Sequence, residues 1–141
     1  VNLTSYNRMV LITGEVPSAD DVKKVEQAVS RLDNVRSVVN ELAVAPASSL
    51  TTRSTDTVTT GRIKAAFIDT KDLQANSIKV VTERGIVYLM GRVTARESKL
   101  AAEVVRGVPG VQKVVRVFES ITEEELAAFR QDPTDKGAKK P

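Results

Sequence analysis

The chain contains no cysteine and no histidine among its 141 residues. The absence of cysteine rules out disulfide bonds and thiolate nucleophiles, and it leaves no cysteine pattern from which to infer the redox compartment. The absence of histidine removes the side chain that most often acts as a general acid or base near neutral pH. Together the two absences exclude the usual zinc ligands and cysteine-based catalysis.

Aromatic residues and long hydrophobic runs are also scarce. Phe, Tyr and Trp make up only 4% of the chain, so a sheet face that stacks nucleic-acid bases is not expected. No apolar run approaches the roughly 20 residues that span a bilayer. No signal peptide is visible, but the sequence starts at Val1 within a strand pattern. We therefore expect an N-terminal piece of the protein to precede this chain.

The charge balance is mildly basic. The net charge is +3, with 21 Lys and Arg against 18 Asp and Glu. The last 21 residues carry five acids and four bases, so residues 1–120 have a net charge of +4. This bias suits an anionic lipid or a nucleic acid and demonstrates neither. A chain of this length forms at most two small domains, which we expect to pack on each other.

One sequence pattern occurs twice. Residues 11–16, with Gly14 near their end, return as residues 88–93 around Gly91, and the two glycines are 77 positions apart. A helix-like stretch and then a valine-rich strand follow each copy. The repeat predicts two copies of one small α+β module.

The two copies are predicted to share one order of elements: strand, strand, helix, strand. The hydrophobic periods predict strands at 1–5, 9–16, 35–44, 78–82, 86–93 and 111–118, and helices at about 18–32 and 95–107. A further helix, at about 57–70 with capping residues at 54–56, leads the second copy. The first copy lacks this leading helix. The fold class is therefore α+β, with α-β-β-α-β modules whose helices cover one face of a small mixed sheet.

These elements divide the chain into five parts. The predicted parts are a first module truncated at its N-terminus, a linker, a second module, a short helix and a disordered tail, at 1–44, 45–54, 55–120, 121–131 and 132–141. We expect the short helix to cover the place that the missing helix of the first module leaves open.

The alternation within each hairpin predicts which side chains face the helices. The helix-facing set is Val1, Leu3, Val10 and Ile12, and the set on the opposite face is Met9, Leu11, Tyr88 and Met90. An apolar sheet face must be buried by something, and we expect each module to cover the other.

Single glycines and clustered acids have structural explanations. Gly14 and Gly91 are not followed by the Gly-Lys-Ser/Thr of a phosphate-binding loop, so backbone geometry explains them. The acids at 20–21 and 123–125 lie at helix starts, where the helix dipole favours them. Residues 107–110 resemble a nucleic-acid clamp loop only faintly, because a proline ends a helix there. We predict no enzyme, no cofactor, no metal site, no nucleic-acid partner and no small-molecule substrate.

Short motifs at corresponding places carry a family resemblance. Both copies end their second strand with an apolar-x-Gly-x-Val pattern, at 10–16 and 87–93. The second copy then begins its last strand with Gly-Val-x-x-Val at 110–114, where the first copy has Asn34 and Val35 in place of Gly-Val. The pattern resembles the BON-domain family, over about residues 1–44 and 55–120. Its tandem members include periplasmic osmotic-stress proteins and dual-BON outer-membrane lipoproteins of Gram-negative bacteria.

The resemblance implies a non-enzymatic protein of the periplasm, at the inner face of the outer membrane. Such a protein would bind anionic phospholipid and support envelope integrity. In the lipoprotein type the leading helix of the second module contacts the membrane, and here that helix is residues 56–70. Relatives carry an aromatic residue near its start, where this chain has Val58, a weaker interfacial anchor. The anchoring cysteine of a lipoprotein would have to lie upstream.

The leading helix of the second module has the chemistry of a membrane surface. Ile63, Ala66 and Phe67 are expected to pack on the sheet, and an adjoining stripe joins apolar residues to cations. Apolar groups bordered by cations suit an anionic bilayer. The predicted lipid-binding residues are Val58, Arg62, Lys64, Ala65, Ile68 and Lys71.

Two alternatives remain open at this stage. Val58 and Ile68 could complete the core or pack against the first module, which would leave no lipid-binding stripe. The chain could also be a protein-interaction module of the periplasm or the outer-membrane assembly machinery. Such a module would bind an envelope protein through the exposed sheet face, near Tyr88 and Met90, or through its valine-rich strand edges.

Overall fold

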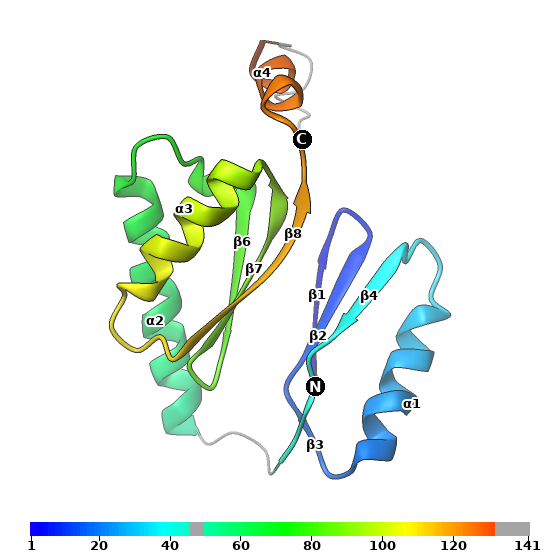
Figure 1. Cartoon of the computed structure of the whole chain (residues 1–141). Coiled ribbons are helices and arrows are strands. Elements are labelled where there is room, and N and C mark those ends of the chain that lie inside the picture. Colours follow the sequence, from blue (N-terminus) through cyan, green and yellow to red (C-terminus); the bar gives the residue numbers. More distant parts are fainter. Residues whose placement is uncertain (46–49, 132–141) are drawn as a thin grey trace.

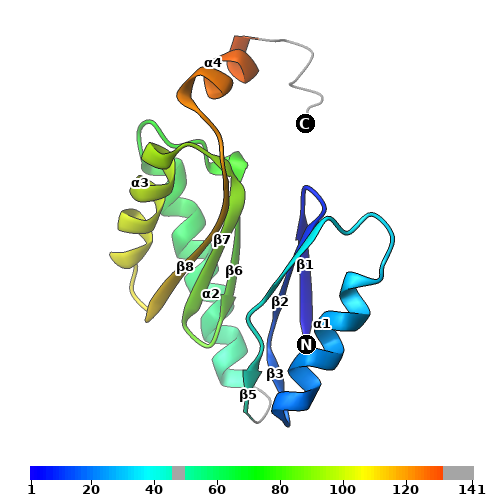
Figure 2. The same cartoon turned by 45° about the vertical axis from the view of Figure 1, so that its right-hand side comes forward.

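Two small sheets lie face to face, with helices on both outer sides (Figure 1). The computed structural model describes residues 1–45 and 50–131. Helix α1 (Ala19–Ser30) covers the outer face of the first sheet, and helices α2 (Leu50–Asp69) and α3 (Ala95–Arg106) cover that of the second (Figure 2). The mixture of helices and small mixed sheets is the α+β class predicted from the sequence.

The two sheets are built in the same way. The first contains β1, β2 and β4, at Asn2–Tyr6, Met9–Thr13 and Ser37–Asn40. The second contains β6, β7 and β8, at Ile78–Glu83, Ile86–Val93 and Lys113–Ser120. In each sheet the first two strands form an antiparallel hairpin, and the third returns through a helix to pair in parallel with the second.

Shorter elements complete the fold. Strands β3 (Glu15–Val16) and β5 (Ala43–Val44) form a parallel pair, so the predicted strands at 9–16 and 35–44 are each split in two. A 3-10 helix, η1 (Ala75–Ser77), leads into β6, and helix α4 (Glu123–Gln131) follows β8. None of the described helices is long and apolar enough to cross a membrane.

The backbone angles explain the turns and the repeated glycines. Asn7 and Arg8 join β1 to β2 with φ angles of 50° and 64°, which are those of a two-residue type I′ hairpin turn. Gly14 and Gly91 have φ angles of 114° and 153°. A Cβ atom on Gly91 would clash with the carbonyl oxygen of Ser77. Backbone geometry therefore accounts for both glycines, as predicted.

An apolar cluster joins the inner faces of the two sheets. Leu11 of the first sheet packs with Tyr88, Met90 and Val117 of the second. This confirms that each module covers the other's free sheet face. Burial, followed by the charges of nearby acids, raises the pKa of the Tyr88 phenol to about 12. Tyr88 and Met90 are buried against the first module, so this sheet face is not open to a partner protein in this structure.

The outer face of β1 is less covered than its counterpart. Leu3 lies opposite Ile12, on the helix side as predicted, but Val1 and Leu3 are 61% and 52% exposed. The corresponding residues of β6, Ile78 and Val80, are 7% and 9% exposed because α2 packs on them. Among the described residues, no helix takes the place of α2 beside β1.

One predicted boundary, the start of α2, differs from the structure. Helix α2 begins at Leu50, so residues 50–54 are helical and not part of a linker. The predicted tail at 132–141 lies outside the described residues, as does part of the linker.

The predicted position of the last helix is also wrong. Helix α4 does not cover the first module but lies beyond the end of β8 (Figure 1). The Ile121 N–H donates to the carbonyl oxygen of Val93, which keeps the chain on the second sheet. Arg96 of α3 then pairs with Glu123 at 3.4 Å, so α4 stays beside the start of α3.

Candidate functional site

One side of α2 anchors the helix on the second sheet. Thr59, Ile63 and Phe67 follow one another at four-residue spacing and are almost completely buried. Ile63 and Phe67 join the main apolar core with residues of β6, β7 and α3. The Thr60 hydroxyl lies 2.7 Å from that of Thr82 on β6. The orientation of α2 about its own axis is therefore fixed by the core.

A buried carboxylate adds a polar contact to this anchor. The Asp56 side chain accepts hydrogen bonds from the backbone N–H groups of Arg84 and Gly85, at 2.7 and 2.9 Å. These two residues form the β6–β7 turn. The sequence suggested Asp56 as a cap for a helix starting at Thr57, but it lies inside α2 and binds the hairpin instead. Hydrogen bonds to a charged group typically contribute about 1.5–3 kcal/mol.

The opposite side of α2 is exposed and carries the predicted lipid-binding residues. Val58 is 52% exposed and Ile68 is 74% exposed. Ala65 lies two turns after Val58 on the same exposed side. The alternative that Val58 and Ile68 complete the core is wrong, because Ile63 and Phe67 already fill the buried side.

Arg62 and Lys64 flank this exposed stripe on its two sides. Lys64 is exposed one turn after Thr60, on the side toward β6, and Lys71 is exposed in the turn that follows α2. Arg62 is exposed on the other side, where its guanidinium reaches the carbonyl oxygen of Pro109 at 3.5 Å. Five of the six predicted residues therefore lie on the exposed surface of α2, and the sixth, Lys71, lies in the turn just after it.

The sequence reasoning missed one neighbour of this surface, the loop between α3 and β8. Gly110 of this loop packs against α2 so closely that a Cβ atom on it would lie 2.6 Å from the Thr59 hydroxyl. Gly110 also has a φ of 97°, which other residues rarely adopt. Its position just after Pro109 suggested only a helix break. The contact with α2 joins residues 51 positions apart, Thr59 and Gly110, which no local pattern reveals.

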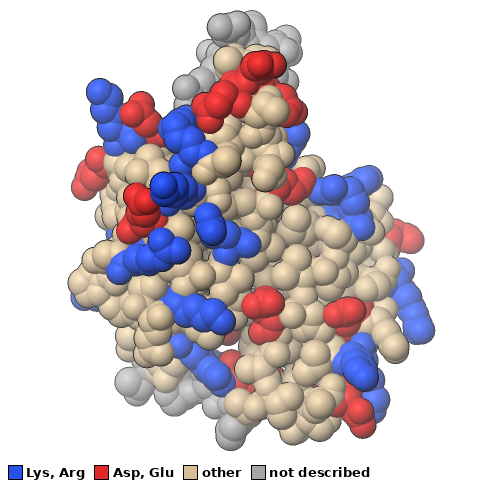
Figure 3. Space-filling view, in the orientation of Figure 1, with Lys and Arg blue, Asp and Glu red and all other residues tan. Residues whose placement is uncertain are grey.

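The positive charge of the chain is concentrated in the second module. Residues 50–120 contain 12 Lys and Arg against 7 Asp and Glu, a net charge of +5, whereas residues 1–45 contain 5 against 6, a net charge of −1. In Figure 3, Lys and Arg side chains gather on the left, over the second module. The two structurally similar halves therefore present different charges to a partner.

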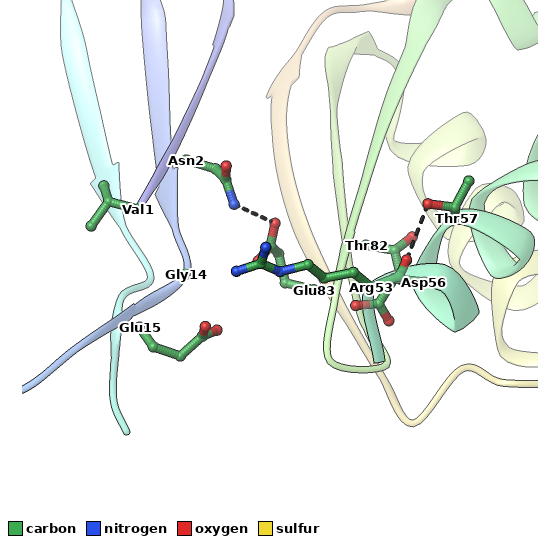
Figure 4. Close-up of a pocket in the computed structure, with 9 residues that line it drawn as sticks. All are labelled: Val1, Asn2, Gly14, Glu15, Arg53, Asp56, Thr57, Thr82 and Glu83. Atoms are coloured by element: carbon green, nitrogen blue, oxygen red, sulfur yellow. Dashed lines mark hydrogen bonds between the residues drawn. The ribbon is translucent and has the colours of Figure 1, made fainter. Parts of the chain in front are cut away.

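A second feature lies at the seam between the two modules. A cavity of about 470 Å³ is lined by residues of β1, α2 and β6 and by Glu15 (Figure 4). The Asn2 side chain donates a 2.9 Å hydrogen bond to Glu83 across it. Burial, together with the negative charge of Glu15, raises the pKa of the Glu83 carboxyl.

The acidic groups of this cavity have structural partners. Asp56 accepts the hairpin N–H groups, Glu83 accepts from Asn2, and Glu15 lies 3.9 Å from Arg84. No set of three or more acidic side chains within residues 1–45 and 50–131 is arranged to hold a metal ion. The cavity is therefore a polar seam that joins the modules, and α2 remains the candidate functional surface.

Comparison with known proteins identifies the pattern shared by the two halves. The BON domain matches residues 1–46 and 55–120 of this chain. These two segments contain the two sheets together with α1, most of α2 and α3.

Several curated proteins are similar over most of the chain. The "Outer membrane lipoprotein DolP" of Haemophilus influenzae is 37% identical over 119 residues, which cover 84% of this chain and 61% of that protein. The "21 kDa hemolysin" of Actinobacillus pleuropneumoniae is 30% identical over 118 residues, with the same two coverages. The "Osmotically-inducible protein Y" of Escherichia coli is 27% identical over 117 residues, covering 81% of this chain and 58% of that protein. The chain thus spans about three fifths of the length of these relatives.

Proposed function

The chain belongs to the BON-domain family, and from this membership we propose that it is a non-enzymatic envelope protein with two BON modules. It binds anionic phospholipid surfaces through α2 of the second module and supports outer-membrane integrity. It works in the periplasm, at the inner face of the outer membrane.

The observation that carries this proposal is the exposed stripe of α2. Val58, Ala65 and Ile68 present apolar groups to a bilayer interface. Ile63 and Phe67, on the buried side of α2, anchor the helix in the core. A helix of this kind lies in the interface plane with its apolar side toward the acyl chains. The flanking cations Arg62, Lys64 and Lys71 are then at headgroup level, where each contributes about 1 kcal/mol near an anionic surface.

The charge distribution supports contact through the second module. The second module has a net charge of +5 and the first has −1. An anionic surface therefore attracts the second module more strongly, and this attraction weakens as salt screens it.

The relatives support the location. One of them is named an outer membrane lipoprotein, and another is named for osmotic induction. Both names fit a protein of the bacterial envelope. Because the chain spans only part of these relatives, anchoring and further partners are properties of the whole protein and are proposed with it.

Co-sedimentation with liposomes tests the proposal. Vesicles with graded phosphatidylglycerol content are mixed with the protein at low and at physiological salt. We expect binding to rise with anionic lipid and to fall with salt. Val58→Asp, which places a charge in the apolar stripe, and Lys64→Glu, which reverses a flanking cation, should each weaken binding about tenfold or more at low salt.

A matched control separates this site from general electrostatics. Lys23→Glu changes the net charge by the same amount as Lys64→Glu but lies exposed on α1 of the first module. We expect its effect on binding to be less than twofold. Equal losses for Lys23→Glu and Lys64→Glu would move the contact away from α2, and no binding by the folded protein at either salt concentration would contradict the lipid proposal.

A further inference from the structure

Strand β8 presents a long, free edge. It is the last strand of the order β6-β7-β8 and pairs with β7 alone among the described strands. It is eight residues long, whereas β4, at the equivalent edge of the first sheet, has four. In Figure 2, β8 is the outermost strand of its sheet. Soluble proteins usually shorten or cover such edges, because unpaired backbone groups there can pair with another chain.

The other edge of the same sheet, formed by β6, makes hydrogen bonds to the first module. On β6, the Lys79 ammonium donates to the carbonyl oxygen of Ser5 at 3.0 Å, and Glu83 accepts from Asn2 at 2.9 Å. On β8, Glu119 near the end of the strand accepts hydrogen bonds from Asn7 and Arg36 of the first module. The segment before it, residues 113–118, keeps its edge free.

The hydrogen-bond pattern shows which backbone groups point outward. The Ile121 N–H donates to Val93 of β7. In a parallel pair, alternate residues of a strand bond to the same neighbour, so the odd-numbered residues of β8 face β7. The N–H groups of Val114, Arg116 and Phe118 therefore point away from the sheet. The first sheet shows the same alternation, with Glu41 and Ala43 donating toward the hairpin.

The surroundings of this edge are positively charged. Lys113 and Arg116 are exposed on β8 itself. The adjoining helix α3 adds the exposed cations Arg96, Lys99 and Arg106. The acids near these cations are fewer: Glu97 is buried in the cap of α3, Glu119 is paired with Arg36, Glu123 is paired with Arg96, and Glu103 is exposed on α3. In Figure 3, Lys and Arg side chains gather over the front of the second module.

We propose that the free edge of β8 binds an extended acidic segment of a partner protein by strand addition. The outward backbone groups of Val114, Arg116 and Phe118 bond to the segment, and the cations of β8 and α3 bind its carboxylates. The same cations disfavour a second copy of this chain, because pairing two β8 edges brings like charges together. This inference does not depend on lipid binding by α2.

Calorimetric titration with designed peptides tests this inference on the full chain. The probe is an eight-residue peptide of alternating Glu and Val, and its partner in the comparison replaces every Glu with Lys. We expect the Glu peptide to bind, with an affinity that falls as salt rises, and the Lys peptide not to bind. In the unmodified protein, NMR hydrogen exchange should slow at the amides of Val114, Arg116 and Phe118 when the Glu peptide is present.

Two variants separate strand addition from simple charge attraction. Val114→Pro removes one outward N–H without removing a bond to β7, and Arg116→Glu reverses a flanking cation. Each should lower the affinity at least tenfold, while Lys24→Glu on α1 should leave it unchanged. Circular dichroism checks that each variant is folded.

Several outcomes would overturn the inference. These are no binding of the Glu peptide, equal binding of the Lys peptide, or unchanged exchange at the three outward amides. Loss of binding with Arg116→Glu but not with folded Val114→Pro would indicate charge attraction alone. Concentration-dependent self-association that Val114→Pro abolishes would identify a second copy as the occupant.

Discussion

At the scale of single residues, Thr13 shows a polar group that folding leaves without a described partner. Its side chain is completely buried, and its hydroxyl makes no hydrogen bond to any described residue. An unpaired buried hydroxyl costs about 1–3 kcal/mol. We expect Thr13→Val, which keeps the shape and removes the hydroxyl, to raise the free energy of unfolding by about 1 kcal/mol. Urea denaturation measures this, and a loss of stability would show that the hydroxyl has a partner.

Glu119 is the residue through which the first module holds the end of β8. Its carboxylate accepts from Arg36 at 2.6 and 2.7 Å and from Asn7 at 3.0 Å. Partial burial alone would raise the pKa of this carboxyl, but the hydrogen bonds from Arg36 and Asn7 and the nearby positive charge outweigh it and lower the pKa. The folded protein therefore favours the ionised form.

A pH-dependent stability difference follows from this lowered pKa. The stabilisation is fully present above the ordinary carboxyl value of 4.5 and is lost as pH falls through the lowered value in the folded protein. We expect Glu119→Gln to reduce the free energy of unfolding by about 0.5–1 kcal/mol at neutral pH, since the pair is partly exposed. Denaturation at several pH values should show the two proteins converging in acid. A constant difference would assign the effect to packing.

At the scale of secondary-structure elements, Gly61 is an unexpected residue in the middle of α2. A Cβ atom at this position would meet nothing within 4 Å. Glycine in an exposed helix interior costs about 1 kcal/mol relative to alanine. We expect Gly61→Ala to raise the free energy of unfolding by about 0.5–1 kcal/mol, as measured by thermal melting. Because the new methyl joins the exposed stripe, liposome binding should be kept or slightly strengthened. Weakened binding would indicate that lipid binding requires the absence of a side chain at position 61.

The elements themselves were predictable wherever their periodicity is strong. Hydrophobic alternation located both hairpins, and the 3.6-residue period located α3 with little error. The start of α2 was not predictable, because residues 50–57 are mostly Ser and Thr and resemble a linker. Asp56 was interpreted as a cap for the same reason. Its true partners, Arg84 and Gly85, are 28 and 29 positions away, and only the folded structure brings them together.

The candidate site was likewise predictable from the sequence only in part. The sequence identified the six residues of the α2 surface, but it could not decide whether Val58 and Ile68 face the core or the solvent. Apolar residues occur on every side of this helix, so its sequence has almost no preferred face. The decision depends on Ile63 and Phe67 filling the space above the sheet, which is a property of three-dimensional packing.

At the scale of the whole molecule, we expect the apolar cluster between the sheets to make the two modules one folding unit. Leu11 contributes a completely buried side chain from the first sheet to a cluster that otherwise comes mainly from the second. A small module buries little surface by itself, so each depends on the other for much of its core. A substitution in this apolar cluster should therefore destabilise both modules together.

Leu11→Ala tests this dependence. Truncating a buried leucine costs about 2–5 kcal/mol through lost burial and the cavity left behind. We expect the free energy of unfolding to fall by that amount in a single transition. Amide hydrogen exchange should then accelerate at the most protected positions of β2 in the first sheet and of β7 in the second. The acceleration should be about equal in the two strands. Ile12→Val, a smaller truncation on the helix side of the same strand, is the control for local damage. If Leu11→Ala accelerated exchange in β2 alone, the modules would be independent domains in contact. The apolar cluster between the sheets would then not fix the orientation of α2 relative to the first module.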